Sequence, residues 1–574
     1  MAKELPRYVD TVIIGNGPSA LILSYILHGW IPYYIGGHYD SILDAKLQER
    51  TCLLDLTPDL YAHFQASLRY STQALPVNTL LDTLLRPNAD TEINPTSCIE
   101  WRFEPERAIE HVAIGQTARP GGQWAEDTIE ASRDIGTLSY AEQLSLPGYT
   151  YSDHVKRAGT EGQQCDFVRP SRKQVAEYLE AYPQAVGIAD AIYTATEVKD
   201  VRRTSSGGFE IGNLGVRCKH LVLASGIFTV NLPPPPLLEP VSRLEDTREP
   251  LLVIGSGFSA ADVIISAATD RKIIHIFQWA PESRASPLRG CHHTAYPEYA
   301  TVYRQMKLST INNSKALAAK SPMLRRKSNP FFTQRDWTSL YEGLPNAEIL
   351  SVAMAPDSTS ASVEIRTSSG DIITRRVGGL EYVVGRRGTL DYLSPPLRVS
   401  VLDGAATTQA PHPQSTSIIS GRTLRSKAES TLEVSPNVFI IGSLAGDSLI
   451  RHAVGGCVYA AGRILDAIPT SLSSHPSPTL LPCSSTETPT TTTASSSHKA
   501  DSDAGGSTSP TTTEASCASQ HSAAVLTNGH SDLHLDRRKL ARAVEQASEQ
   551  NRAWVETGWW AGGGSVGGWP GTLN

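Results

Sequence analysis

The fold of this chain is decided by Val12-Ile13-Ile14-Gly15-Asn16-Gly17-Pro18-Ser19-Ala20. The apolar residues before Gly15 are typical of a buried parallel strand, and the apolar run Leu21–Leu27 is typical of a helix. Between them lies the GxGxxG/A fingerprint of a dinucleotide-binding βαβ unit. Its first glycine makes the tight turn, its second lets a pyrophosphate approach, and its small third residue packs helix on strand. The pyrophosphate then lies at the positive N-terminus of the helix.

A second turn of the same kind follows about 240 residues later, and it reads Leu252-Val253-Ile254-Gly255-Ser256-Gly257-Phe258-Ser259-Ala260. It also follows an apolar run, and the apolar stretch Ala261–Ala268 after it is typical of a helix. One such turn is a weak signal, because glycine turns occur without a ligand. Two turns, each after a strand, predict two dinucleotides, and the pair expected is FAD with a nicotinamide cofactor.

The length and the net charge of the chain limit the number of domains and the kinds of partner that we expect. The chain has 574 residues, of which 40% are hydrophobic and 19% charged, so it is long enough for several domains with sizeable cores. The formal net charge is −7 and no basic run is present. This balance argues against a partner that is nucleic acid or an anionic membrane.

The cysteine pattern bears on compartment and on redox chemistry. The 8 cysteines are scattered and none forms a C-x-x-C pair, so neither a zinc knuckle nor a redox-active dithiol is expected. Scattered thiols suit a reducing compartment, and we expect a cytoplasmic protein. Residues 1–10 are polar and do not form a signal peptide. No long uninterrupted apolar stretch predicts a transmembrane segment, since the best candidate, Leu251–Ala268, contains the second glycine turn and Asp262.

The order of predicted elements gives the domain organisation. We expect an α/β fold with two dinucleotide-binding Rossmann-like domains. An FAD-binding domain over residues 8–240 and 370–468 would be interrupted by an NADPH-binding insert over residues 248–360. Ile31–Ile35 is the expected second strand of the first βαβ unit, and Ser171–Tyr182 is an expected amphipathic helix. Val363–Arg366 and Tyr382–Gly385 are expected as strands that return to the first domain.

The composition changes abruptly after Pro469. Residues 470–530 are dominated by Ser, Thr, Pro and Ala and predict a disordered linker, because they cannot bury enough surface to offset the entropy of ordering. In residues 531–574, apolar residues from Leu540 to Ala547 at helical spacing predict one short helix before a Gly- and Trp-rich end. This helix is either a marginal element of the tail or a site for a protein partner.

A third glycine turn follows the apolar run that ends at Ile441. Gly442-Ser443-Leu444-Ala445-Gly446-Asp447 is typical of FAD domains of the glutathione-reductase type, in which the acid lies beside the ribityl–phosphate part of the flavin. The next helix directs its N-terminus at the flavin ring, where it can stabilise negative charge. The alternative is that Asp447 is an ordinary helix N-cap.

The chain resembles the oxidative stress-induced growth inhibitor family, a branch of the flavoproteins similar to flavin-containing monooxygenases. The resemblance covers roughly residues 8–468. It rests on the first two glycine turns and on four further stretches: Leu84–Pro87, Pro120–Trp124, Tyr296–Tyr299 and Leu444–Ser448. It implies FAD binding, an NADPH-binding insert and monooxygenase-type chemistry on a small-molecule substrate.

The resemblance also implies roles for individual residues. The FAD site would comprise Gly15, Gly17, Pro18, Ser19, Gly122, Trp124, Gly446 and Asp447, with Gly226 in the strand that joins the domains. The NADPH pyrophosphate would be held by Gly255, Gly257 and Ser259. Trp124 has the alternative of being a core aromatic residue.

Two departures concern the acid that usually ends the second strand and binds the ribose. In the first unit, Tyr34–His38 contains no acid and the next is Asp40, so the adenosine end of the FAD site has no assigned residue. In the second unit Ile273–Phe277 is the expected second strand, and Phe277–Ala280 at its end contains no acid either, which removes the group that would repel a 2′-phosphate. Because Arg284 follows, we expect NADPH to be preferred over NADH. Arg289 and Arg271 are weaker candidates, and Arg271 is expected to be a surface residue.

The favoured interpretation is a flavin-dependent monooxygenase. NADPH would reduce FAD, and the reduced flavin would react with O2 to give a peroxyflavin that oxygenates a small molecule. The cofactor carries the chemistry, so no catalytic side chain is assigned; Arg451 is a candidate near the flavin, and His452 is expected to be structural. Two alternatives stand beside it. One is a disulfide-type reductase, which the missing C-x-x-C disfavours, and the other is a nucleotide-binding regulator of growth or stress that acts through protein partners.

Overall fold

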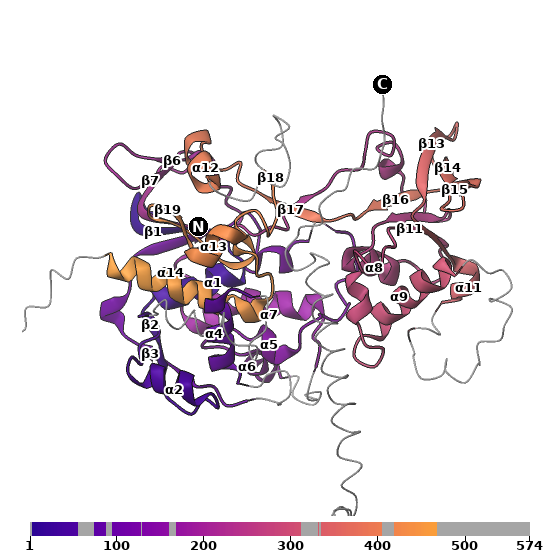
Figure 1. The fold of residues 1–574 in the computed structure, drawn as a ribbon. Coiled ribbons are helices and arrows are strands. Elements are labelled where there is room, and N and C mark those ends of the chain that lie inside the picture. The colour runs from indigo at the N-terminus through magenta and orange to yellow at the C-terminus, as the bar shows by residue number, and fades with distance from the viewer. Residues whose placement is uncertain are drawn as a thin grey trace, which may run out of the picture. The chain divides into compact units, whose positions relative to one another are not determined.

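The computed structural model describes residues 3–55, 74–87, 95–127, 129–159, 168–311, 331, 335–403 and 418–467 (Figure 1). The predicted linker over residues 470–530 and the predicted helix at Leu540–Ala547 lie outside these residues. The described strands form several sheets, two of which are mainly parallel. One of the first two glycine turns lies at an edge of each of these two sheets. This arrangement confirms the predicted α/β fold with two dinucleotide-binding units.

The first sheet is built around β1 (Tyr8–Ile14), which lies between β8 (Val216–Leu223) and β4 (His111–Ile114). These three strands run parallel, so their carboxyl ends share one edge. The sheet continues with β5 (Ile192–Tyr193), β20 (Val438–Ile440), β19 (Glu433–Ser435), β7 (Phe209–Ile211) and β6 (Val201–Arg203). Because later strands add on both sides of β1, its carboxyl end is a switch point of the kind at which open α/β sheets bind ligands.

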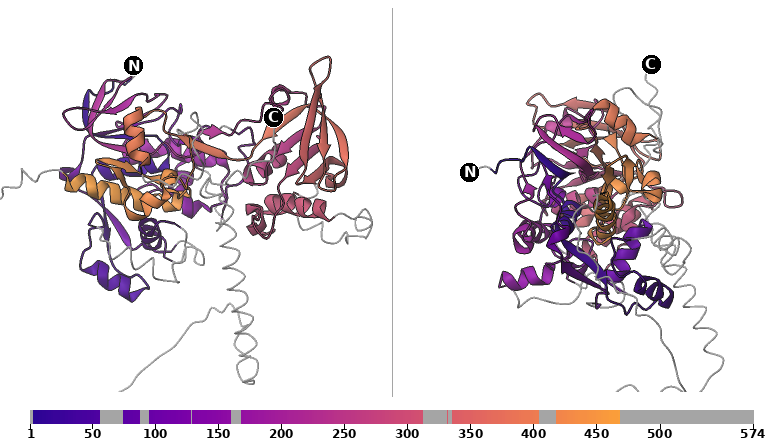
Figure 2. Two further views of the ribbon diagram at one scale, coloured as in Figure 1. Left: turned by 45° about the horizontal axis from the view of Figure 1, so that its top comes forward. Right: turned by 90° about the vertical axis from the view of Figure 1, so that its left-hand side faces the viewer.

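Helix α1 (Pro18–Leu27) is buried on every side from Ala20 to Leu27, as its largely apolar sequence requires. It packs against α14 (Val454–Asp466), which in turn packs on α4 (Pro76–Leu85). Figure 2 shows from two further sides that α14, at the orange end of the colour scale, lies beside the indigo N-terminal elements. Gly455 permits the contact between α14 and α4, because a Cβ there would overlap the backbone carbonyl oxygen of Val77.

The helix predicted at Ser171–Tyr182 is confirmed as α7 (Arg172–Val186). It begins with a reciprocal capping box between Ser171 and Gln174 and ends at Gly187 in the left-handed conformation. The shorter helices around the first sheet are α2 (Ser41–Gln48), α5 (Ala141–Leu144), α6 (Tyr151–Arg157), α12 (Pro395–Leu402) and α13 (Arg425–Ser430).

The second strand of the first βαβ unit is not the one predicted. The expected strand at Ile31–Ile35 forms as β2 (Trp30–Tyr34), but it pairs with β3 (Ile99–Phe103) in an antiparallel two-stranded sheet apart from the first sheet. The strand that pairs with β1 after α1 is β4. An apolar run predicts a strand but does not identify the strand that pairs with it, because pairing depends on residues far away in the sequence.

The second sheet has the order β12-β11-β10-β16 and is entirely parallel. Its strands are β10 (Leu251–Ile254), β11 (Ile273–Phe277), β12 (Tyr341–Pro345) and β16 (Gly379–Tyr382). Its helices are α8 (Phe258–Ser266), which joins β10 to β11, α9 (Pro297–Thr310) and α11 (Trp337–Leu340). The second βαβ unit therefore closes directly, with the strand that the sequence predicted.

The strands expected to return to the first domain pair instead with the second unit. Val363–Arg366 lies in β14 (Ala361–Arg366), between β13 (Glu348–Met354) and β15 (Ile372–Val377) in an antiparallel sheet. Tyr382 ends β16, which pairs with β10. The chain returns at β17 (Arg386–Thr389), which pairs with β9 (Val230–Asn231) and β18 (Ile418–Ile419). The two chain crossings between the units are thus hydrogen-bonded to each other.

Among the residues that the structure describes, no helix combines the length and the apolar character that crossing a membrane requires.

Candidate functional site

The first glycine turn joins β1 to α1 at the carboxyl edge of the first sheet. Gly15 has φ +128°, and a Cβ there would overlap the backbone carbonyl oxygen of Ala224, so only glycine is tolerated. Gly17 is the N-cap of α1, and a Cβ on it would meet no atom within 4 Å. Because Gly17 has no side chain with which to cap α1, the first N–H groups of the helix face the space beside it and suit an anion.

The Gly-Gly-x-Trp turn predicted to contact the flavin lies directly on this first turn. The N–H of Gly121 donates to the carbonyl oxygen of Asn16 at 2.8 Å, and a Cβ on Gly122 would lie 3.1 Å from the Cα of Gly17. Trp124 is half-buried in the short 3-10 helix η3 (Gly122–Trp124) and packs against the core of the first sheet. The structure therefore brings together residues that are about a hundred positions apart in the sequence.

The third glycine turn also reaches the start of α1. It forms the 3-10 helix η8 (Gly442–Ala445), in which a Cβ on Gly442 would overlap the hydroxyl oxygen of Ser19. Gly226 lies close by, since a Cβ on it would be 3.3 Å from the Oγ of Ser443. Gly446 follows in the left-handed conformation, with φ +101°. Ser19, Gly226 and Gly446 are thus grouped at one edge of the sheet.

Asp447 is buried and fully engaged by protein groups. Its Oδ2 accepts hydrogen bonds from the N–H of Leu75 at 2.8 Å and from Nδ2 of Asn78 at 2.6 Å. Its Oδ1 accepts from the guanidinium of Arg425 at 2.5 Å. Asp447 does not act as the N-cap of α14, because Ala453 holds that position. The contact of Asp447 with a flavin stays a prediction.

A buried ionic cluster lies immediately before α14. Arg451 donates to Oδ2 of Asp82 through Nη2 at 2.6 Å and through Nε at 3.0 Å, and Arg86 donates to Oδ1 at 3.1 Å. Burial alone would raise the pKa of Asp82, but Arg451 and Arg86 outweigh burial and hold that pKa below its usual value. Burial lowers the pKa of His452, whose Nε2 lies 3.8 Å from the same carboxylate. The structure thus places both Arg451 and His452 in a structural cluster.

The same cluster accounts for the Leu84–Pro87 stretch on which the resemblance rested. Besides its pairing with Asp82, Arg86 donates through Nε to the carbonyl oxygen of Glu142 at 3.1 Å and through Nη2 to that of Ser145 at 3.0 Å. Arg86 therefore joins α4 to the segment around α5. Its role in this structure is to hold elements of the first unit together.

The second glycine turn repeats the geometry of the first. Gly255 has φ +156°, and a Cβ there would overlap the carbonyl oxygen of Val383. Gly257 is the N-cap of α8, again without a side chain to cap it, and Ser259 is the second residue of that helix. The Oγ of Ser256 accepts from the N–H of Gln278, at the end of β11, at 2.9 Å. The second turn therefore offers uncapped helix N–H groups of the same kind, which suit an anion.

The structure distinguishes Arg284 from Arg271 as a possible ligand of a 2′-phosphate. Nη1 of Arg284 donates to Oε1 of Gln278 at 3.3 Å, which places Arg284 at the end of β11 where a ribose is usually bound. Arg271 lies before the start of β11 and donates to the carbonyl oxygens of Glu249 and Asp246, both at 3.1 Å. Arg271 is therefore a structural residue, whereas Arg284 remains a candidate ligand of the 2′-phosphate.

The place of the ribose-binding acid in the first unit is the end of β4, and not the end of β2, where the sequence predicted it. Asp40 is the N-cap of α2, and its Oδ1 accepts from the N–H groups of Ile42 and Leu43 at 3.1 and 3.3 Å. The true second strand, β4, ends at Ile114 and is followed by Gly115 and Gln116, so no acid stands there either. The apolar run at His111–Ile114, shortly before the Gly-Gly-x-Trp turn, is the signal that could have identified this strand.

Asp127, which sequence reasoning missed, joins the segment after Trp124 to α7 and to the returning strand β17. Arg386 of β17 donates to Oδ1 of Asp127 at 2.8 Å, and Arg172 of α7 pairs with the other carboxylate oxygen. Burial lowers the pKa of Arg386 to about 10. The hydroxyl of Tyr299 donates to Oδ1 of the half-buried Asp262 at 2.8 Å, which gives the Tyr296–Tyr299 stretch a structural role.

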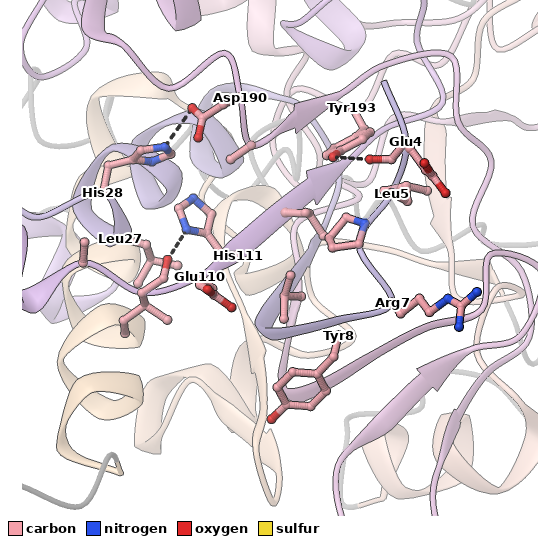
Figure 3. Close-up of a pocket in the computed structure, with 16 residues that line it drawn as sticks. Glu4, Leu5, Arg7, Tyr8, Leu27, His28, Glu110, His111, Asp190 and Tyr193 are labelled. Carbon is pink, nitrogen blue, oxygen red and sulfur yellow. Dashed lines mark hydrogen bonds and ion pairs between the residues drawn. The ribbon is translucent and has the colours of Figure 1, made fainter. Parts of the chain in front are cut away.

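A hollow lies at the opposite, amino edge of the first sheet (Figure 3). It is lined by the starts of β1 and β4, whereas the glycine turns lie at the carboxyl ends. His28 pairs with Asp190 at 3.1 Å, and the ring of His111 is held by Ser24 at 2.9 Å and by the carbonyl oxygen of Ile109 at 2.7 Å. Since this type of sheet binds dinucleotides at carboxyl ends, the hollow is not the nucleotide site.

A glycine turn at the edge of a parallel sheet, present twice in one chain, defines a protein of the class with two dinucleotide-binding units. The chain is 26% identical over 506 residues to oxidative stress-induced growth inhibitor 1 of Mus musculus, covering 80% of this chain and 95% of that protein. It is 28% identical over 353 residues to oxidative stress-induced growth inhibitor 2 of Homo sapiens, covering 51% and 68%. These relatives confirm the resemblance predicted from the sequence. No family model matches the chain.

Two solved structures are similar at a lower level. A flavin-containing monooxygenase from Stenotrophomonas maltophilia has a TM-score of 0.42 and 15% identity, covering 80% of this chain and 98% of that one. A bacillithiol disulfide reductase from Bacillus cereus has a TM-score of 0.43 and 11% identity, covering 80% and 99%.

Proposed function

We propose that this protein is an FAD- and NADPH-dependent oxidoreductase of the monooxygenase type that uses O2 to oxygenate a small molecule. The observation that carries the proposal is the Gly-Gly-x-Trp turn stacked on Gly17, in a chain with a second complete glycine turn. A single dinucleotide site would suffice for a binding protein. Two sites in one chain suit transfer of reducing equivalents from one nucleotide to the other.

The residues present suit the two cofactors. In the first unit, Gly15, Gly17 and the start of α1 would hold the FAD pyrophosphate, because the space beside Gly17 is open and the helix N-terminus favours an anion. Trp124 would lie against the flavin. When bound, FAD supplies the capacity to accept a hydride and to activate oxygen.

In the second unit, Gly255, Gly257 and Ser259 would hold the NADPH pyrophosphate at the start of α8. Arg284 would pair with the 2′-phosphate, and the absence of an acid at Gln278 leaves that phosphate unopposed. Asp127, bonded to Arg172 and Arg386, ties the segment after Trp124 to the crossing strand β17. We infer that this ion pair fixes the flavin turn relative to the chain that carries the NADPH site.

The disulfide-reductase alternative gains no support from the thiols. The five cysteines among the described residues are all free. Burial raises the pKa of Cys218 and of Cys291 to about 12, so neither is a ready thiolate. The scattered free thiols are also the ground on which we propose a reducing, cytoplasmic compartment.

A second candidate function follows from the relatives, which are named as growth inhibitors. The chain would then bind the nucleotides as signals and act through a protein partner, with little catalysis. The two functions differ in whether NADPH is consumed.

The experiment that decides is to purify the full chain, record its visible spectrum, and follow NADPH oxidation with and without O2. The proposed function requires a flavin spectrum and an NADPH oxidation that depends on O2. A flavin spectrum without turnover would favour the regulatory role, and a colourless protein that takes up no added FAD would refute both the flavin assignment and the oxygenase.

A further inference from the structure

The place of the ribose-binding acid in the first unit is held by a residue without a side chain. In the register of the sheet Ile14 lies opposite Ile114, so Gly115 is the first residue beyond the second strand. In dinucleotide-binding units an Asp or Glu at this place hydrogen-bonds the ribose hydroxyls. Here the residue is glycine.

The space that a side chain on Gly115 would need is filled by Asn16. A Cβ built on Gly115 would overlap the carboxamide of Asn16, and its three nearest atoms are Cγ, Nδ2 and Oδ1 of that residue. Asn16 is the middle residue of the Gly-Asn-Gly turn, so its backbone is fixed by the same glycines that form the phosphate site. Its carboxamide thus stands at the end of β4 in place of the usual carboxylate.

The hydrogen bonds of this carboxamide leave it capacity for a ligand. The hydroxyl of Thr117 donates to Oδ1 of Asn16 at 2.9 Å, whereas Nδ2 lies at the limit of hydrogen bonding, 3.5 Å, from the carbonyl oxygens of Thr117 and Arg119. A primary amide has two N–H donors and an oxygen with two lone pairs. Asn16 is 3% exposed, and one oxygen lone pair and weakly engaged N–H groups of its buried carboxamide remain for another partner.

We propose that the Asn16 carboxamide binds the adenosine ribose of FAD in place of the absent carboxylate; this inference rests on the proposed function, which puts FAD in the first unit. The two neighbouring carbonyl oxygens explain why the residue is an amide. A carboxylate at the same place would face two acceptors and have nothing to donate to them. A neutral amide also makes the ribose contact independent of pH in the range where carboxylates titrate.

The test exchanges the two positions. Asn16→Gly removes the amide and is expected to weaken FAD binding about tenfold, the loss of one or two hydrogen bonds. Asn16→Gly with Gly115→Glu restores the usual acid in the space that Asn16 vacates, and it is expected to bring the FAD dissociation constant back to within about threefold of the wild type. The matched control, Asn16→Gly with Gly115→Ala, fills the space without a ribose ligand and is expected to remain weak.

Titration with FMN, which has no adenosine ribose, separates ribose binding from support of the turn. Equal FMN affinity in all four proteins is expected, and the unfolding midpoint of each apoprotein checks that it is folded. The inference is overturned if Asn16→Gly leaves FAD affinity unchanged, if the Gly115→Ala double variant binds FAD as tightly as the Gly115→Glu one, or if FMN affinity falls in parallel. A wild type that takes up no flavin would overturn the proposed function and this inference with it, whereas the variant results bear on the ribose alone.

Discussion

In the first glycine turn Gly15 lies against the carbonyl of Ala224, and in the second Gly255 lies against that of Val383. Each carbonyl belongs to the residue that follows the neighbouring parallel strand. The two turns differ at the end of the next strand, where Asn16 fills the space above Gly115 in one unit and Ser256 accepts from the backbone of Gln278 in the other. The turn that binds the pyrophosphate in such a site is therefore fixed by backbone packing. The residue at the end of the second strand, which binds the ribose, can differ from one site to another.

The largest effects are expected at the glycines that the two units share. Gly15→Ala should destabilise the first unit by about 4 kcal/mol, the sum of left-handed backbone strain and overlap with a backbone carbonyl. Gly17→Val, whose Cβ enters open space, should cost about 1 kcal/mol as a poorer N-cap and yet abolish FAD binding. Urea unfolding of the apoproteins, together with flavin absorbance, checks both values. Equal stability loss in the two variants would contradict the separate roles.

Next in size is the buried cluster before α14, which supports the first unit only. Asp82→Asn leaves Arg86 and Arg451 largely buried without their carboxylate, and it should destabilise the protein by about 3 kcal/mol. Asp391→Asn is the matched control, because its partner Arg398 is paired with a largely exposed carboxylate and the expected loss is below about 1 kcal/mol. Denaturant unfolding measures both, and similar small losses would show that the cluster is not structural.

A smaller effect tests the ribose half of the second turn. Arg284→Met should raise the apparent constant for NADPH by the loss of one charge-assisted contact, about 1.5–3 kcal/mol, with little change for NADH. Arg366→Met, which changes a half-exposed arginine of β14 in the separate antiparallel sheet, should change neither. Steady-state kinetics with both nucleotides provides the measurement. Equal use of NADPH and NADH by the wild type would refute the assignment.

The smallest effect concerns a buried histidine in each second strand, His111 in β4 and His275 in β11. Burial lowers the pKa of each to about 4 from 6.5. The unfolded chain therefore binds more protons between these values, so the stability present above pH 6.5 is lost as the pH falls toward 4. At pH 5.5 we expect a loss of about 1 kcal/mol from each histidine. Unfolding midpoints measured from pH 7 to 5 should show a shallower slope in His111→Gln and in His275→Gln, and an unchanged slope would contradict the burial argument.

Local signals predicted much of this structure. The sequence predicted the glycine turns, the strand at Ile273–Phe277 and the helix capped by Ser171. Each of these features depends on residues close together in the sequence. The grouping of Gly17, Gly122 and Ser19 at one edge also agrees with what the motifs implied.

Non-local pairing accounts for what the sequence did not predict. Two apolar strands, β2 and β4, both follow α1, and only distant contacts decide which of them pairs with β1. The ion pair of Asp82 with Arg451 joins residues 369 positions apart, and no spacing rule connects them. The strand predicted at Ile31–Ile35 did not point to Gly115, because the place of the ribose-binding acid is defined only by the register of the sheet.

The late position of β20 and α14 has a consequence for the order in which the chain becomes structured during synthesis. The second sheet is complete once Tyr382 has left the ribosome, since its strands lie between Leu251 and that residue. The first sheet begins at Tyr8 but waits for β20, which starts at Val438, and α1 waits for α14. Domains generally fold as units while the chain is made. We therefore expect the second unit to fold first, while the largely apolar α1 stays exposed on the nascent chain and needs a chaperone's protection.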